Sequence, residues 1–178
     1  MAEVPDEELM VAYRGGNAGA FESLYARHRT RLFRFVLRSI KARSIAEELY
    51  QEIWIRVIEA RATYTPKARF STWLYTIAHH HLVDHWRKRG LTLVALDGEE
   101  IASGSPDPAD HAQARQALSR FAGALEALPP LQREAFLLHE EGGLSIAEIA
   151  TATQSNEETA KSRLRYAMAK LKAAVSDD

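Results

Sequence analysis

The stretch from Arg69 to Arg89, RFSTWLYTIAHHHLVDHWRKR, constrains the fold more than any other part of the chain. Its apolar positions recur at spacings of three and four, the pattern of one face of a helix of about six turns: Phe70, Leu74, Ile77 and His81. A different stripe carries Trp73, Thr76, His80 and Arg87. Rings stack on unpaired bases, and Arg and Lys neutralise phosphates. The helix can therefore be either a core helix with a basic end or a helix that holds an opened nucleic acid strand.

The same helical periodicity covers most of the chain, and no segment requires a strand. It predicts further helices over residues 5–13, 18–40, 44–64, 108–127, 131–141, 146–152 and 156–175. Ser44 and Ser145 are each followed three residues later by Glu, which is the spacing of a capping box. The expected inward residues are Leu49, Ile53, Val57 and Ile58 in the third helix and Leu164, Met168 and Leu171 in the last. The arginines at positions 27, 29, 31, 34 and 38 are interpreted as a solvated face.

The charge of the chain is distributed unevenly, although the net charge of 178 residues is only −1. Residues 1–96 hold 15 Lys and Arg against 10 Asp and Glu, whereas residues 97–112 hold five acids and no Lys or Arg. The segment after Gly90 is also rich in Gly, Ser, Pro and Asp, which is typical of a linker. We therefore expect an all-α fold of two small helical domains, at 1–90 and 113–178, joined by an acidic flexible linker at 91–112, with Leu91 to Leu96 extended.

Several functional classes are disfavoured by composition. The sequence has no cysteine, so it offers no disulfide, thiolate metal site or thiol nucleophile. It shows no apolar run long enough to cross a bilayer and begins with an acidic segment, so a cytoplasmic protein is expected. His81 and His85 are four apart and could face one metal, with Asp84 nearby. Because His81 continues a packing stripe, we expect a structural histidine, no required metal and no cofactor.

The segment LSIAEIATATQSNEETAKSRLRYAMAKLKA has the spacing of a helix-turn-helix. A short helix and a polar turn precede a second helix, which carries polar and cationic side chains: Thr159, Lys161, Ser162, Arg163, Arg165 and Tyr166. Such a helix can enter the major groove of DNA. An ordinary helical hairpin is the alternative that this segment alone leaves open.

Taken together, these segments resemble a bacterial sigma factor of the extracytoplasmic-function group, and the resemblance covers almost the whole chain. Its most specific parts are AEELYQEIWIRVI and FSTWLYTIAHHHLVDHWRKR in the first half, and LPPLQREAFLLHEEGGLSIAEIA with ETAKSRLRYAMAKL in the second. The resemblance implies a non-enzymatic subunit that binds core RNA polymerase and promoter DNA, directs strand opening and initiates transcription. In this family an anti-sigma factor commonly clamps both domains, and we expect one here.

The resemblance also assigns roles to residues. It implies polymerase binding by Glu48, Gln51, Glu52 and Trp54. It implies binding of the opened −10 element by Phe70, Ser71, Trp73, His80, Arg87 and Lys88. It implies −35 recognition by Thr159, Lys161, Ser162, Arg165 and Tyr166, with Arg163 serving phosphates.

Four residues depart from the family pattern. His80 stands where Asn is usual, Gln154 where Gly is frequent, and Glu157 and Glu158 begin the recognition helix, where neutral residues are usual. Two acids suit a helix N-terminus but would repel phosphate, so −35 recognition is expected to be weak or of unusual sequence.

Two other functional classes fit the sequence less well. A stand-alone helix-turn-helix regulator would need neither the segment around Glu48 nor the aromatic stretch after Pro66. A metal-dependent hydrolase lacks a plausible set of ligands and a nucleophile in this sequence.

Overall fold

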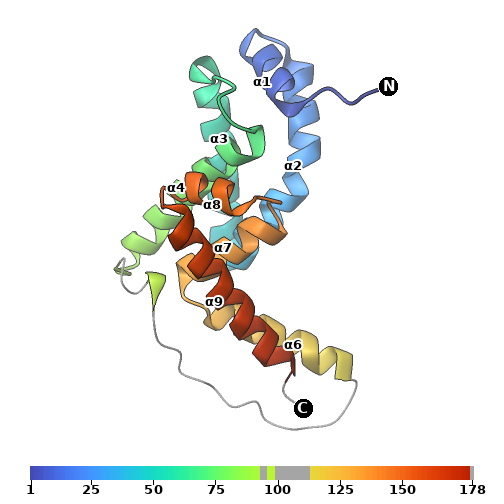
Figure 1. Ribbon diagram of the computed structural model, residues 1–178. Helices are drawn as coiled ribbons and strands as arrows, with labels where there is room; N and C mark the ends of the chain where they lie inside the picture. Colours follow the sequence, from blue (N-terminus) through green and yellow to red (C-terminus); the bar gives the residue numbers. More distant parts are fainter. Residues whose placement is uncertain (93–95, 99–112, 177–178) are drawn as a thin grey trace.

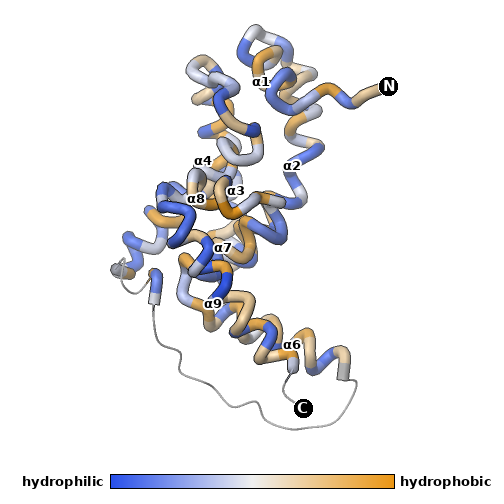
Figure 2. Tube along the Cα trace, viewed as in Figure 1, coloured by the Kyte–Doolittle hydropathy of each residue, from blue (hydrophilic) through white to orange (hydrophobic). Residues whose placement is uncertain are grey.

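The computed structural model describes residues 1–92, 96–98 and 113–176, and these form an all-helical molecule. The elements are α1 (Asp6–Arg14), α2 (Ala18–Ser39), α3 (Arg43–Ala60), the 3₁₀ turn η1 (Arg61–Thr63), α4 (Phe70–Lys88), α6 (Gln113–Ala127), α7 (Pro130–Glu140), α8 (Ile146–Ala152) and α9 (Glu157–Ser176). Helices α1–α4 form one domain and α6–α9 the other (Figure 1). Hydrophilic and hydrophobic residues alternate along the helices, as amphipathic helices around a core require (Figure 2).

The core of the first domain lies between α2, α3 and α4. Leu32 and Phe35 of α2, Ile53 of α3, and Leu74 and Leu82 of α4 are all inaccessible to solvent. Helix α4 buries a broader surface than the predicted stripe, because Tyr75, Ala78 and Trp86 are buried as well. The predicted helix over Arg69–Arg89 is confirmed, and it packs in the core along most of its length.

The second domain is built on α9, which contacts α6, α7 and α8. The Ser145 hydroxyl accepts a hydrogen bond from the Glu148 amide at 3.2 Å, and the Glu148 carboxylate accepts one from the Ser145 amide at 3.2 Å. This is the predicted capping box. The Asn156 side chain caps α9 by accepting a hydrogen bond from the Thr159 amide at 2.7 Å.

Three sequence predictions within the helices are wrong. Helix α3 begins one residue before Ser44, and the Ser44 side chain makes no cap; Arg43 pairs with Glu47 across one helical turn instead. Ile58 and Met168 were expected to point inward but are 38% and 47% exposed. The buried face of α3 includes Trp54 and Val57 but not Ile58, and that of α9 includes Ala167 but not Met168.

The two domains pack directly against each other, through α4 with α8 and α2 with α7 (Figure 1). The first domain contributes cations and the second contributes acids. Arg38 at the end of α2 pairs with the buried Glu141, and Arg34 lies 3.9 Å from the other oxygen of that carboxylate. Arg34 and Arg38 therefore pair with the second domain while about half of each side chain stays exposed, so the arginine run on α2 is a solvated face only in part.

The turn after α7 allows this close approach because it contains Gly142 and Gly143. A Cβ atom at Gly142 would lie 2.6 Å from the Leu138 carbonyl oxygen and 3.3 Å from the Tyr75 ring of α4. Gly143 adopts a φ of 66°, a conformation that glycine tolerates best. The glycine pair follows the end of α7 and brings the turn against the first domain.

Most of the predicted linker, including 93–95 and 99–112, lies outside the described residues. The segment predicted to be extended at 91–96 is described only at its ends, and Leu96 there is helical, contrary to expectation. Its described part is attached to the protein, since Leu96 is completely buried.

Candidate nucleic-acid and protein interfaces

The outer face of α3 is polar with an apolar margin. Glu48, Gln51 and Glu52 are all exposed, and Ile55 on the same helix is 54% exposed. Trp54 differs from the other three residues predicted to bind polymerase, because it is only 6% exposed. Its ring packs against Phe21 and Tyr25, with centroids 5.9 and 5.0 Å apart. The structure thus presents an acidic surface on α3 and places Trp54 behind it, as a support.

At the N-terminus of α4, an aromatic cluster fixes the start of the helix. Phe70 is fully buried, and its amide donates a hydrogen bond to the Glu7 carboxylate at 2.7 Å. Trp73 is half-buried, with its ring centroid 5.0 Å from that of Tyr64 and 5.7 Å from that of Phe70. Ser71 is also buried. Of these three predicted −10 residues, Trp73 alone has a partly accessible ring in this arrangement.

The second half of α4 is open to solvent along one side. His80, Arg87 and Lys88 are exposed. His81 hydrogen-bonds through Nδ1 to the Ile77 carbonyl at 3.0 Å, as a structural histidine would. Burial, together with the nearby Arg89 and Lys88 cations, lowers the pKa of His85. Within the described ranges, acids and histidines form no group of three that could hold a metal ion.

Helix α9 displays its predicted −35 residues at different depths. Lys161, Arg165 and Tyr166 are exposed, whereas Thr159, Ser162 and Arg163 are half-buried. The guanidinium of Arg165 lies over the Tyr166 ring, 5.4 Å from its centroid, a contact that holds a flexible cation near the surface of the helix.

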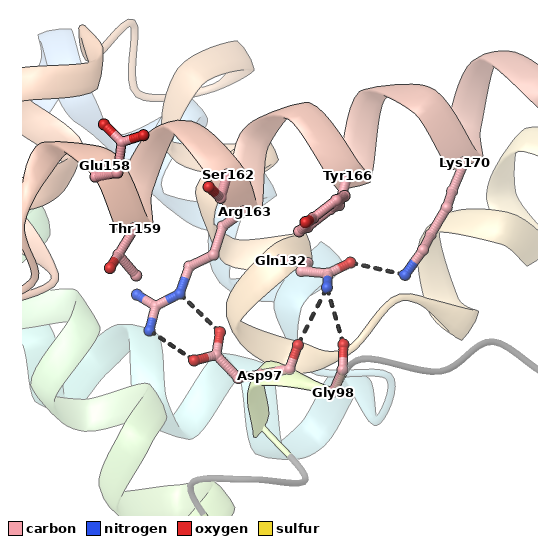
Figure 3. A pocket seen from close by; sticks show the side chains of 9 residues that line it. All are labelled: Asp97, Gly98, Gln132, Glu158, Thr159, Ser162, Arg163, Tyr166 and Lys170. Atoms are coloured by element: carbon pink, nitrogen blue, oxygen red, sulfur yellow. Dashed lines mark hydrogen bonds and ion pairs between the residues drawn. The ribbon is translucent and has the colours of Figure 1, made fainter.

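Arg163 is already bound to a carboxylate of the same chain. Its Nε and Nη2 donate to the two oxygens of Asp97 at 2.8 and 3.1 Å (Figure 3). The side chain of Gln132 donates to the carbonyl oxygens of Asp97 and Gly98 at 3.1 and 3.0 Å, and accepts from Lys170 at 2.8 Å. Asp97, Gln132 and Lys170 were not expected to be partners from the sequence. An acid in a linker and a Gln inside a helix carry no distinguishing pattern.

These contacts border a hollow of about 600 Å³ on the outer side of α9. Asp97 and Gly98 of the linker line the lower side of the hollow in Figure 3. The upper side is lined by residues of α9: Glu158, Thr159, Ser162, Arg163 and Tyr166.

The domain contact brings the two predicted DNA-binding surfaces together. A second hollow, of about 270 Å³, is lined by His80 and Arg87 of α4 and by Gln154 and Arg163 of the helix-turn-helix. Gln154 has a φ of 53°, which explains why a glycine suits this position of the turn. Two of the −10 candidates, His80 and Arg87, therefore line the same hollow as one −35 candidate, Arg163.

Glu148 joins the helix-turn-helix to α4. Its carboxylate accepts a hydrogen bond from the Thr72 hydroxyl at 2.8 Å and lies 3.3 Å from an Arg69 nitrogen. Burial by itself would raise the pKa of Glu148, but the hydrogen bonds from Ser145 and Thr72 and the charge of Arg69 outweigh it and lower that pKa. The capping residue of α8 is thus also a charged contact between domains.

Comparison with known proteins identifies the class. Residues 24–92 match the family described as Sigma-70 region 2, and residues 118–171 match Sigma-70, region 4. The chain is 34% identical to the RNA polymerase sigma factor CarQ of Myxococcus xanthus, covering 92% of this chain and 93% of CarQ. It is 32% identical to the ECF RNA polymerase sigma factor SigK of Mycobacterium sp. (strain KMS), covering 86% and 81%.

A solved structure shows the same fold. It is that of the sigma factor RpoE in complex with the anti-sigma factor NepR from Bartonella quintana, at 26% identity and a TM-score of 0.68 over 89% of this chain and 98% of that one. The chain belongs to the sigma-70 family, and its function is that of an RNA polymerase sigma factor. Within that family it belongs to the ECF group, so the resemblance inferred from the sequence is confirmed.

The two matched regions also decide between the alternatives. A stand-alone helix-turn-helix regulator would account for region 4 but not for region 2, so that alternative is not favoured. Every helix among the described residues is too short or too polar to cross a membrane.

Proposed function

We propose that the two domains divide promoter recognition between them. Residues 1–90 bind polymerase and the opened −10 strand, residues 113–178 bind the −35 duplex, and the linker at 91–112 spans the gap. The observation that carries this assignment is the pairing of a region 2 match with a region 4 match on one chain, each ending in a helix with an exposed cationic side. The subunit itself catalyses no reaction and works in the cytoplasm.

The polymerase-binding surface in this proposal is the outer face of α3. Glu48, Gln51 and Glu52 offer carboxylates and an amide beside the exposed Ile55. An acidic patch with an apolar margin is complementary to a partner surface that carries Arg or Lys around a small apolar contact. Trp54 supports this face through its packing on Phe21 and Tyr25 and does not itself touch the partner.

Strand opening is assigned to α4 and to the aromatic cluster at its start. Removing a base from its stack costs a few kcal/mol, and a ring that receives the base together with cations that follow the backbone offsets this cost. Trp73 supplies the accessible ring, and Arg87 and Lys88 supply the cations. His80, also exposed, can donate a hydrogen bond or stack where Asn is usual in the family.

Reading both elements requires the domains to separate. The names of the −10 and −35 elements place them about 25 base pairs apart, which is about 85 Å of duplex. In the closed arrangement, however, His80, Arg87 and Arg163 line one hollow. The closed form is therefore a resting form, and binding of core polymerase shifts the population toward an open one by engaging surfaces that the domain contact covers.

An anti-sigma factor is the inhibitory partner in this proposal. The complex of RpoE with NepR is a precedent in a related sigma factor. A protein that binds both domains at once would stabilise the closed form, because it can contact the two domains together only when they lie close to each other.

Run-off transcription tests the proposal. Purified chain and core polymerase, incubated with a library of promoter fragments, are expected to yield discrete transcripts from templates that share two separated sequence elements. Transcripts that begin at random positions, or an equal yield without the chain, would contradict it.

A further inference from the structure

Residues 96–98 are held in place by the burial of Leu96 and by contacts of Asp97 and Gly98 with the second domain. Leu96 is completely buried. The side chain of Gln132, 4% exposed, holds the main-chain carbonyls of Asp97 and Gly98, and Lys170 orients Gln132 from the other side. Asp97 then reaches Arg163 through two parallel hydrogen bonds (Figure 3). The segment is therefore docked at a defined position beside the recognition helix.

The geometry of the Asp97 contact is that of a phosphate substitute. An Arg guanidinium presents the same pair of N–H groups to a carboxylate and to a phosphate. Arg163 is only 14% exposed in its side chain while Asp97 holds it, so the guanidinium cannot engage a second anion by the same edge. Gly98 and Asp97 also border the hollow into which Ser162 and Tyr166 face.

We propose that residues 96–98 are an intramolecular competitor of −35 DNA, in which the Asp97 carboxylate occupies the site of a DNA phosphate on Arg163. This inference rests on the proposed role of α9 in −35 binding. The linker segment must leave α9 before the duplex docks, so free chain binds promoter DNA weakly. In the holoenzyme, whatever draws the linker away also frees the recognition helix.

The strength of the competition depends on how far the pair of Asp97 and Arg163 is exposed to solvent. The Asp97 side chain is 46% exposed, so water and salt screen the pair, and a lone pair of this kind has a modest effect. Because Leu96 and Gln132 already position the segment, little further ordering is needed to form the pair. We expect removal of the Asp97 charge to raise DNA affinity by about three- to tenfold.

The experiment measures binding of the full chain to a fluorescent duplex that carries the −35 element selected by transcription, at low ionic strength. Asp97→Asn is expected to bind about three- to tenfold more tightly than the unmodified chain. Glu22→Gln removes the same charge from an exposed position on α2 and is expected to leave the affinity unchanged. In an Arg163→Ala background, Asp97→Asn is expected to give no gain, because its effect acts through Arg163.

The outcomes separate this inference from the proposed function. If Arg163→Ala weakens binding but Asp97→Asn binds like the unmodified chain, the competition is wrong and the −35 assignment stands. An equal gain in DNA affinity from Glu22→Gln would also overturn the competition, because the gain from Asp97→Asn would then result from the change in net charge. If Arg163→Ala changes nothing, or if no variant binds the duplex, both the competition and the role of Arg163 fail.

Hydrogen exchange provides a second measurement that does not depend on a variant. The Leu96 amide donates to the Thr92 carbonyl at 2.9 Å in the docked segment. Saturating duplex is expected to speed exchange of this amide at least tenfold, because the segment is displaced. Unchanged protection of Leu96 in the DNA complex would contradict displacement.

Discussion

His79 of α4 and Glu134 of α7 meet across the domain boundary, with Nδ1 of the imidazole 2.7 Å from a carboxylate oxygen. Both side chains are nearly inaccessible, at 8% and 0% exposed. The second oxygen of Glu134 is buried and has no hydrogen-bond partner among the described residues. This pair therefore links the two domains at a point where loss of either group leaves the other buried and unpaired.

Glu134→Ala is expected to destabilise the closed form by about 1–3 kcal/mol, the cost of leaving a buried polar group unsatisfied. The expected signs are a lower melting temperature and a larger radius of gyration in solution scattering. Glu134→Gln keeps an acceptor for His79 and should lose less. Glu140→Ala, at an exposed position of the same helix, is the control. A compact, equally stable Glu134→Ala protein would show that the pair does not hold the domains together.

Trp73→Ala should impair strand opening more than duplex binding. The partly accessible Trp73 ring is the surface on which an unstacked base can rest, whereas duplex contacts come from exposed cations. Permanganate reactivity of −10 thymines in the holoenzyme complex should fall by about tenfold or more, while transcription from a pre-opened template should be largely retained. An equal loss on both templates would indicate that Trp73 acts through folding, since it packs on Tyr64 and Phe70.

Arg165→Ala should reduce discrimination between −35 sequences by about 1–3 kcal/mol, as expected for a lost base contact. Arg165 is exposed and lies over Tyr166, so it is available to a base edge without rearrangement. Competition binding by the holoenzyme with a panel of −35 variants measures the effect. Lys172→Ala, an exposed cation farther along α9, should weaken all sequences alike. The role of Arg165 would be refuted if both variants kept the full spread of affinities.

Gln154→Gly should stabilise the second domain by about 1 kcal/mol. Gln154 has a φ of 53°, where a Cβ atom is unfavourable and glycine is not. Gln154→Ala keeps the Cβ atom and should bring no gain. Urea denaturation of the three proteins checks this, and equal midpoints for Gly and Ala would contradict the explanation.

The contact between Glu148 and α4 should weaken in acid. The folded-state pKa of Glu148 is lowered from its ordinary value of 4.5, so its stabilising effect is complete above about that pH and is lost as the pH falls through the lowered pKa. The free energy of unfolding of Glu148→Gln should therefore lie below that of the unmodified chain at pH 7 and approach it as the pH falls through the lowered pKa of Glu148. Asp6, whose pKa is lowered by Arg27 and His28 against the effect of burial, stays in both proteins and cancels in the comparison. A gap that does not depend on pH would show that the Glu148 charge is not involved.

The helices were largely predictable because each has a local cause. The spacing of Phe70 and Leu74, the Ser145 capping box and the Asn156 cap are all fixed within a few residues of sequence. The error at Ser44 also has a local cause. Ser44 is followed three positions later by Glu47, which is the spacing of a capping box, but the helix begins one residue before Ser44.

The domain contact was not predictable from one sequence. His79, Glu134 and Glu141 look like ordinary polar residues of amphipathic helices, and their burial depends on a partner more than 50 positions away. The docking of Asp97 on Arg163, 66 positions apart, is hidden for the same reason. Trp54 was assigned to the polymerase surface by resemblance, although helical spacing places it beside the buried Ile53 and Val57; its ring packs on Phe21 and Tyr25.

In the proposed function, this chain starts transcription with core polymerase and must open to do so. Lys41 and Glu126 allow a direct test, because they pair across the domain boundary at 3.2 Å and are both exposed. The sequence contains no cysteine, so Lys41→Cys/Glu126→Cys can be joined selectively by a short bis-maleimide linker.

Run-off transcription with core polymerase is then compared between the joined double variant, the unreacted double variant and the two reacted single variants. We expect full transcription activity from every form except the joined protein, which should give no promoter-specific transcript. Full activity of the joined protein would contradict the need for opening, and absence of a specific transcript from every form, the unmodified chain included, would contradict the sigma-factor function itself.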